Sequence, residues 1–140
     1  MKINCIIIED EPLARTKLAG FIQKVDFLFL LAEFDNGLEA FNFLQAHQVE
    51  LIFLDIQMKD FDGMQFLNTL TQQSKVVITS AYSQYALKGY EHNVVDYLLK
   101  PFGLERFLKA IDKVANGWIP EPAPIQDQHK RKADPYQRYL

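Results

Sequence analysis

The sequence predicts an α/β fold, a doubly wound sheet of five parallel strands in the order 2-1-3-4-5. Three observations predict it. Short apolar runs alternate with amphipathic stretches from residue 3 to about residue 116. The central runs are apolar throughout rather than alternating, which is typical of strands that are covered on both faces. The segments between the runs are long enough for helical crossovers, which are right-handed almost without exception.

The predicted strands are short runs that are mostly apolar, and several are rich in β-branched residues. The first run, INCIII, is too short for a helix to be the better interpretation. The second run ends at Asn36-Gly37, which is a turn signal. In chain order the predicted strands cover Ile3–Ile8, Phe27–Phe34, Leu51–Leu54, Lys75–Thr79 and Val94–Leu99.

Five helices are predicted between and after these strands. Pro12 suits the first turn of the first helix, where Arg15 falls away from the apolar side. A turn signal at 60–63 precedes the third helix, and Asn116-Gly117 ends the last one. The apolar sides of the first two helices carry Leu13, Leu18, Phe21, Ile22, Leu38, Phe41 and Leu44. After the first helix, the others cover 38–47, about 64–70, 83–91 and 104–115.

Composition excludes several classes of protein. The chain has 140 residues, a formal net charge of -3 and a pI near 5.6, which gives no reason to expect a nucleic-acid-binding surface on the domain itself. Its single cysteine, Cys5, lies in an apolar run and is interpreted as a small buried hydrophobe. No apolar run is long enough to span a bilayer, and Glu9-Asp10 interrupts any signal peptide. We therefore expect a soluble, cytoplasmic protein with no membrane partner.

The character of the sequence changes after Trp118. Residues 119–124 are rich in proline and cannot continue a helix, and a basic cluster follows at 129–132. The sequence thus predicts one domain over 1–118 and a proline-rich, basic linker or tail over 119–140.

Chemically active side chains follow four of the predicted strands. Glu9 and Asp10 follow the first strand, Asp55 the third, Thr79-Ser80 the fourth and Lys100-Pro101 the fifth. In the order 2-1-3-4-5 these strands are successive neighbours, so their carboxyl ends meet at one edge of the sheet. Crowded carboxylates without convergent His or Cys suit a hard cation such as Mg²⁺. Asp55 is then the candidate nucleophile, because a carboxylate can form an acyl phosphate.

The sequence resembles the receiver domain of bacterial response regulators over about residues 1–117. The matching stretches are IIIEDEPLAR, LIFLDIQMKDFDGMQFL at 51–67, VVITSAYSQYALKGYE at 76–91 and VVDYLLKPF at 94–102. The resemblance implies a flavodoxin-like receiver fold and a signalling domain rather than a classical enzyme, one that catalyses its own phosphorylation and dephosphorylation. Lys59, Glu9 and Ser80 depart from the residues commonest in the family, although none of them removes a needed functional group.

The resemblance also implies a role for each site residue. Asp55 is the phosphoacceptor, and Lys100, in an expected cis peptide with Pro101, and Ser80 assist it. Mg²⁺ or Mn²⁺ is bound by Asp10 and Asp55, by Glu9 through water, and by the backbone carbonyl of Gln57. Ser80, favoured over Thr79, and Tyr97 form the switch, and Gln57 and Tyr82 modulate the phosphoryl lifetime. The implied partners are a sensor histidine kinase and a second copy, which binds through residues 83–115 on phosphorylation.

The stretch at 81–102 is particularly similar to receivers attached to LytTR-type DNA-binding domains. DNA would then be contacted only through a domain absent from this chain. The alternative is a stand-alone receiver that acts by protein–protein interaction.

Two other classes of protein share parts of this pattern. Haloacid-dehalogenase-like hydrolases also use a strand-end Asp, Mg²⁺ and a Lys, but they place the nucleophile on the first strand in a DxD motif, whereas this first strand ends in EDE. A flavodoxin-like electron carrier would need a phosphate-binding loop after the first strand, where Glu9-Asp10-Glu11 would repel a flavin phosphate. Both are disfavoured.

Overall fold

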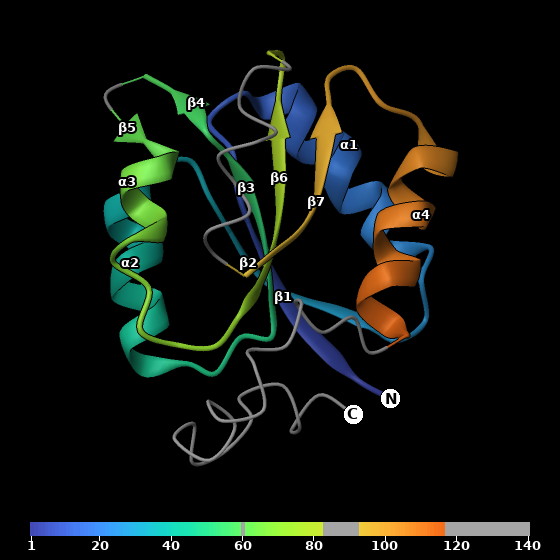
Figure 1. Cartoon of the computed structure of the whole chain (residues 1–140), viewed down its shortest axis with the longest axis horizontal. Helices are drawn as coiled ribbons and strands as arrows, with labels where there is room; N and C mark the ends of the chain where they lie inside the picture. Colours follow the sequence, from blue (N-terminus) through green and yellow to red (C-terminus); the bar gives the residue numbers. More distant parts are fainter. Residues whose placement is uncertain (60, 83–92, 117–140) are drawn as a thin grey trace, which may run out of the picture.

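A computed structural model describes residues 1–59, 61–82 and 93–116. Within these ranges five parallel strands form one sheet in the order β2-β1-β3-β6-β7, and β4 and β5 pair separately as an antiparallel hairpin (Figure 1). Because β4 and β5 lie outside the main sheet, β6 and β7 are its fourth and fifth strands. The order of the sheet is therefore the predicted 2-1-3-4-5. The sheet strands are β1 (Ile3–Ile8), β2 (Leu28–Phe34), β3 (Leu51–Asp55), β6 (Lys75–Ser80) and β7 (Val94–Leu99).

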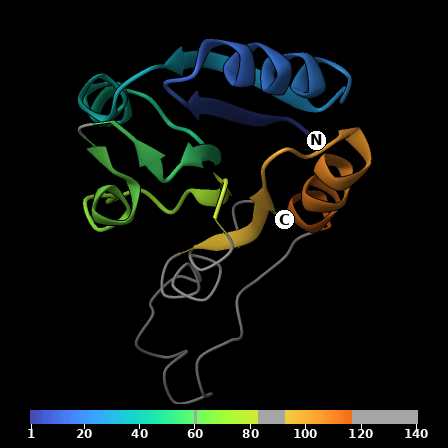
Figure 2. The same cartoon turned by 90° about the horizontal axis from the view of Figure 1, so that it is seen from above.

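Helices cover both faces of the sheet, as expected for a doubly wound fold. Viewed from above, α1 and α4 lie on one face, while α2 and α3 lie on the other (Figure 2). The helices are α1 (Pro12–Gln23), α2 (Gly37–Ala46), α3 (Gly63–Leu67) and α4 (Leu104–Ala115). The helix predicted at 83–91 and the linker predicted at 119–140 lie outside the described residues.

Two hydrophobic clusters fill the space between sheet and helices. Leu18 and Ile22 of α1 and Phe107 of α4 join one cluster, whereas Leu44 of α2 and Phe66 of α3 join the other. Every residue of β3 and β6 is buried, which explains why the central part of each strand is apolar. Cys5 is buried as predicted, and burial raises the pKa of its thiol to about 12.

Side-chain caps mark where α1 and α2 begin. The Glu11 carboxylate accepts a hydrogen bond from Ala14 N at 2.6 Å, and Pro12 supplies the first helical residue of α1. Asn36 caps α2 in the same way by accepting from Glu39 N at 2.9 Å. These caps fix each helix directly after a strand end, which is where the site lies.

The structure corrects three local expectations. The turn expected at 60–63 includes the second strand of a hairpin formed by β4 (Gln57–Met58) and β5 (Phe61–Asp62), and α3 ends at Leu67 rather than near residue 70. The sequence predicts Leu13 and Leu38 on apolar helix faces, but both are largely exposed. Each belongs to the first turn of its helix, which begins at the carboxyl edge of the sheet where little of the sheet remains to cover it.

An ion pair joins the last helix to the edge strand. Both nitrogens of the Arg106 fork lie 2.8 Å from the Asp96 carboxylate, and Lys113 Nζ lies 3.4 Å from it. Burial would raise the pKa of Asp96, but the hydrogen bonds from Arg106 and Tyr97 N and the nearby positive charges outweigh burial and lower it. The paired, deprotonated form of Asp96 therefore stabilises the fold.

Arg106→Ala is expected to destabilise the domain at pH 7 by about 1–2 kcal/mol, less than the cost of breaking a fully buried pair because Arg106 is partly exposed. Because the pKa of Asp96 is lower in the folded state, this contribution is complete above the unfolded pKa of about 4 and disappears as the pH falls through the folded value. Urea denaturation between pH 7 and pH 3 measures it. The exposed Lys109→Ala is the control, and an equal loss in both variants would contradict the prediction.

Candidate functional site

The carboxyl edge of the sheet brings the predicted chemical groups together. Asp55 is paired in register with Thr79, and Ser80 is paired with Leu99, directly before Lys100. Glu9 and Asp10 follow the end of β1, which neighbours β3. The parallel register therefore places the ends of β1, β3, β6 and β7 side by side, as the sequence predicts.

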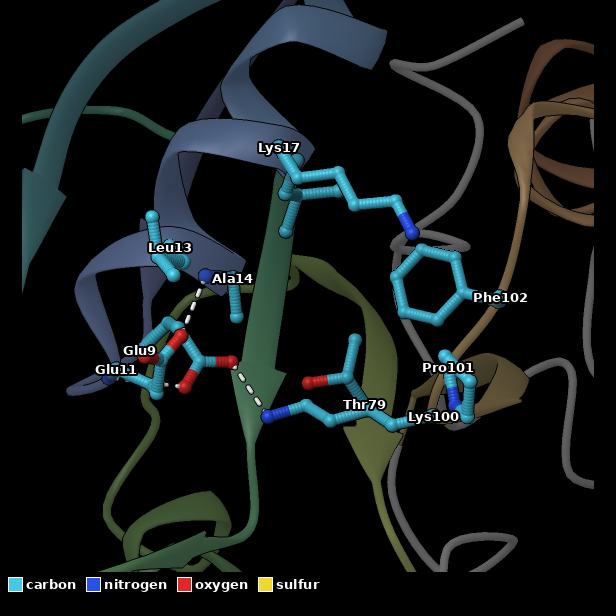
Figure 3. A pocket seen from close by; sticks show the side chains of 10 residues that line it. Glu9, Glu11, Leu13, Ala14, Lys17, Thr79, Lys100, Pro101 and Phe102 are labelled. Carbon is cyan, nitrogen blue, oxygen red and sulfur yellow. Dashed lines mark hydrogen bonds and ion pairs between the residues drawn. The ribbon is translucent and has the colours of Figure 1, made fainter.

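Lys100 connects the two buried carboxylates. Its Nζ lies 2.8 Å from Glu9 Oε1 and 3.1 Å from Asp55 Oδ2, and Figure 3 shows the ammonium directed at Glu9. Burial alone would lower the pKa of Lys100, but the hydrogen bond to Glu9 and the charge of Asp55 outweigh burial and raise it. The ammonium is thus kept charged beside Asp55. The Lys100-Pro101 peptide is cis, as expected.

Glu9 is a buried carboxylate with a raised pKa. The residue is only 3% exposed, and its Oε2 accepts a hydrogen bond from Glu11 N at 3.1 Å. Burial, followed by the neighbouring Asp55, raises the pKa of Glu9 to about 7, while Lys100 acts in the opposite direction. Additional positive charge at this site would therefore favour the ionised form.

Three carboxylates are arranged as oxygen donors for a cation. One oxygen from each of Glu9, Asp10 and Asp55 lies within 4.8 Å of the other two. Gln57 N donates to Asp55 Oδ1 at 2.9 Å, and Lys59 N donates to Asp10 Oδ2 at 3.1 Å. An all-oxygen set with few carboxylates fits Mg²⁺, which retains several waters in such sites. These residues therefore fit the predicted cation.

The predicted switch residues form one hydrogen-bonded unit. Ser80 is fully buried, and its hydroxyl accepts from Tyr82 N at 3.0 Å and lies 3.3 Å from the Tyr82 carbonyl oxygen. The Tyr97 hydroxyl donates to the same carbonyl oxygen. Tyr82 thus links the hydroxyl at the end of β6 to the aromatic residue of β7, while Tyr82 itself is 52% exposed.

Arg15 is a site residue that the sequence interpretation missed. Its Nη1 donates to the Glu9 carbonyl oxygen at 2.7 Å, and its Nε lies 3.6 Å from Glu33 of β2. The expectation that Arg15 faces away from the apolar side holds, but that direction leads to the acidic loop rather than only to solvent. Helical periodicity carries no signal for such a contact, because the contact depends on how the loop before α1 folds back.

A pocket of about 250 Å³ adjoins Lys100 between the start of α1 and the loop after β7 (Figure 3). Its walls are largely apolar. Leu13, which is 79% exposed, lines it rather than the core. The other lining residues are Glu9, Glu11, Ala14, Lys17, Leu18, Thr79, Lys100, Pro101 and Phe102.

Comparison with known proteins identifies the family. Residues 5–112 match the model of the response regulator receiver domain. The chain belongs to this family. Receiver domains are signalling domains that bind Mg²⁺ at an acidic pocket and interact with histidine kinases, and members of the family dimerise.

Among the described residues, no helix is long and apolar enough to cross a membrane.

The chain is similar to two proteins along most of its own length. The protein MrkE of Klebsiella pneumoniae is 32% identical over 120 residues, which cover 84% of this chain and 45% of MrkE. The transcriptional regulatory protein LytR of Staphylococcus aureus is 32% identical over 115 residues, which cover 80% of this chain and 47% of LytR. The chain thus spans about half the length of the curated relatives that it matches. The likeness to LytR supports the predicted relationship to receivers of the LytTR type.

Solved structures support the same fold. The response regulatory domain of MrkE superposes with a TM-score of 0.75 at 30% identity, over 83% of this chain and 98% of that one. TrrA from Thermotoga maritima, solved in complex with Mg²⁺ and BeF, superposes with a TM-score of 0.69 over 81% of this chain and 98% of that one. At 23% identity it shows the fold alone.

Proposed function

We propose that this receiver domain accepts a phosphoryl group on Asp55 from a sensor histidine kinase, with Mg²⁺ or Mn²⁺ bound at the acidic site. One observation carries the proposal. The Lys100 ammonium lies between Glu9 and Asp55, next to a cluster of three carboxylate oxygens at the sheet edge. Asp10 and Asp55 would bind the cation directly, Glu9 through water, and Gln57 through its backbone carbonyl.

The chemistry is a phosphoryl transfer between a donor nitrogen and a carboxylate. An Asp55 oxygen forms the new bond to phosphorus while the bond from phosphorus to the donor imidazole breaks and the imidazole departs with its electron pair. A bound divalent cation would cancel the repulsion between the carboxylate and the phosphoryl oxygens. Lys100 adds a second positive charge, already positioned before the donor arrives.

Phosphorylation would be read through Ser80 and Tyr97. To donate to a phosphoryl oxygen, the Ser80 hydroxyl has to give up its donated contact with the Tyr82 carbonyl oxygen, to which Tyr97 is also bonded. Movement of Ser80 toward the phosphate would therefore change the surroundings of the carbonyl oxygen that Tyr97 binds, and Tyr97 could then turn inward. Tyr82 and Gln57 would modulate the lifetime of the acyl phosphate, Tyr82 by shielding it from water. Faster phosphate release from Tyr82→Ala than from the wild type would support this role, and an unchanged rate would contradict it.

The output that we propose is a LytTR-type DNA-binding domain that follows this chain, with a homodimer formed through residues 83–115 on phosphorylation. The described part of that surface, on β7 and α4, carries two exposed leucines, Leu99 and Leu108. The second candidate is a stand-alone receiver that acts by protein–protein interaction. Sedimentation with and without beryllofluoride tests the dimer, and an unchanged mass at high concentration argues against it.

The proposed chemistry makes phosphorylation strictly dependent on a divalent cation. With acetyl phosphate and Mg²⁺, the full chain is expected to gain one phosphoryl group by intact mass spectrometry, and with EDTA in place of Mg²⁺ it is expected to gain none. Readdition of Mn²⁺ should restore the modification. Equal phosphorylation with and without a divalent cation would contradict the proposed role of the acidic cluster.

A further inference from the structure

Gly37, the first residue of α2, is packed against the ring of Phe61. A Cβ atom built on Gly37 would lie 1.7 Å from Phe61 Cε1 and 2.3 Å from Phe61 Cζ. The backbone φ of Gly37 lies outside the left-handed region, so that lack of space, not conformation, requires glycine here. The Phe61 ring thus occupies the space that any side chain at position 37 would take.

The Phe61 ring cannot turn away freely, because other groups hold it. Phe66 of α3 packs on it with a centroid distance of 5.3 Å and an interplanar angle of 57°. The Phe61 backbone pairs with Met58 across the β4–β5 hairpin, and the Met58 side chain is buried in the same hydrophobic cluster. Phe61 therefore anchors the hairpin to the start of α2.

Two backbone N–H groups connect this hairpin to the acidic site. One belongs to β4 and the other to the residue after β4. Gln57 N donates to Asp55 Oδ1 at 2.9 Å, and Lys59 N donates to Asp10 Oδ2 at 3.1 Å. These bonds orient two of the three carboxylates that would bind the cation. A displacement of the hairpin would move both donors, and with them the Gln57 carbonyl.

We propose that Phe61, packed over Gly37, is a positioning residue for the cation site and acts through the β4–β5 hairpin. The proposal rests on the proposed function only in assigning Mg²⁺ to the three carboxylates. Groups that orient metal ligands typically change metal affinity by about 10- to 100-fold when they are removed. Because Phe61 acts through backbone hydrogen bonds, we expect an effect at the lower end of this range.

The test is a double-mutant cycle between Gly37→Ala and Phe61→Ala in the full chain. Each single variant should bind Mg²⁺ about tenfold more weakly by isothermal titration calorimetry. The double variant should bind no more weakly than Phe61→Ala alone, because the added methyl then has no ring to displace. Gly20→Ala is the matched control. Nothing lies within 4 Å of the Cβ that it adds, so its Mg²⁺ affinity should equal that of the wild type.

Amide hydrogen exchange followed by NMR gives a second readout that needs no metal. The Gln57 and Lys59 amides should exchange faster in Gly37→Ala and Phe61→Ala than in the wild type. A lower melting temperature with unchanged Mg²⁺ affinity and unchanged exchange would overturn the proposal, since it would show a merely structural role. If the wild type itself binds no Mg²⁺, the proposed function fails, while the exchange of these two amides still decides the role of Phe61. Should Gly37→Ala not fold, Phe61→Ala, which removes atoms without adding a clash, decides alone.

Discussion

We expect Asp55→Asn to abolish phosphorylation by acetyl phosphate in the presence of Mg²⁺, with no phosphoryl group detectable by intact mass spectrometry. Asp55 is 3% exposed, and its carboxylate contacts both Lys100 Nζ and Gln57 N. The substitution keeps the size of the side chain but replaces a nucleophilic oxygen with an amide, which forms no acyl phosphate under these conditions. The amide also removes one of the three carboxylates of the cation site.

The exposed Asp26→Asn is the matched control, because it makes the same chemical change before β2, at the opposite edge of the sheet, and should be phosphorylated like the wild type. Tandem mass spectrometry of the modified wild type should place the label on Asp55. Undiminished labelling of Asp55→Asn would reject the assignment of the phosphoacceptor and would direct attention to Asp10 or Glu9.

Lys100→Ala is expected to reduce the rate of phosphorylation by acetyl phosphate by about a hundredfold or more, and to make Mg²⁺ binding tighter. The ammonium lies 3.1 Å from Asp55, where it would stabilise negative charge that develops on the phosphoryl oxygens. The same ammonium competes with a cation for the carboxylates, so its removal leaves Glu9 and Asp55 with an unneutralised charge that Mg²⁺ can neutralise.

Two comparisons make this second prediction specific. Lys100→Arg retains the positive charge but not the shape of the ammonium. Its phosphorylation rate and its Mg²⁺ affinity should lie between those of Lys100→Ala and the wild type. Lys109→Ala removes an exposed lysine of α4 and should change neither quantity. A Lys100→Ala variant that is phosphorylated at the wild-type rate would show that the ammonium only balances the buried carboxylates.

The sheet and most of the site were predictable because each depends on a strong local signal. β1, β3 and β6 are mostly apolar because both faces of the sheet are covered, and polar residues at the ends of parallel strands lie at one edge. These two rules place Asp55 beside Lys100 without knowledge of any side-chain angle. The bounds of β7 and α4 also agree with the prediction, because β7 is a short, mostly apolar run and the apolar residues of α4 recur at helical spacing.

The remainder depends on contacts that a local pattern does not encode. The strands β4 and β5 are two residues long each, too short for any periodicity to reveal them. Arg15 reaches the Glu9 carbonyl, and Phe61 reaches Gly37, through loops whose shape is set by the packed domain. Leu13 obeys the apolar period of its helix, yet it lies beyond the part of the helix that covers the sheet.

The main chain of Tyr97 is held on both sides. Its amide donates to Asp96 Oδ1 at 2.8 Å, and its carbonyl accepts from Arg106 Nη2 at 3.1 Å. With the strand fixed at this point, Tyr97 can respond to its neighbours only by torsion about its side-chain bonds. Such rotations are far quicker than the sliding of strands or helices. The response of Tyr97 would then be limited by side-chain rotation and not by movement of the strand.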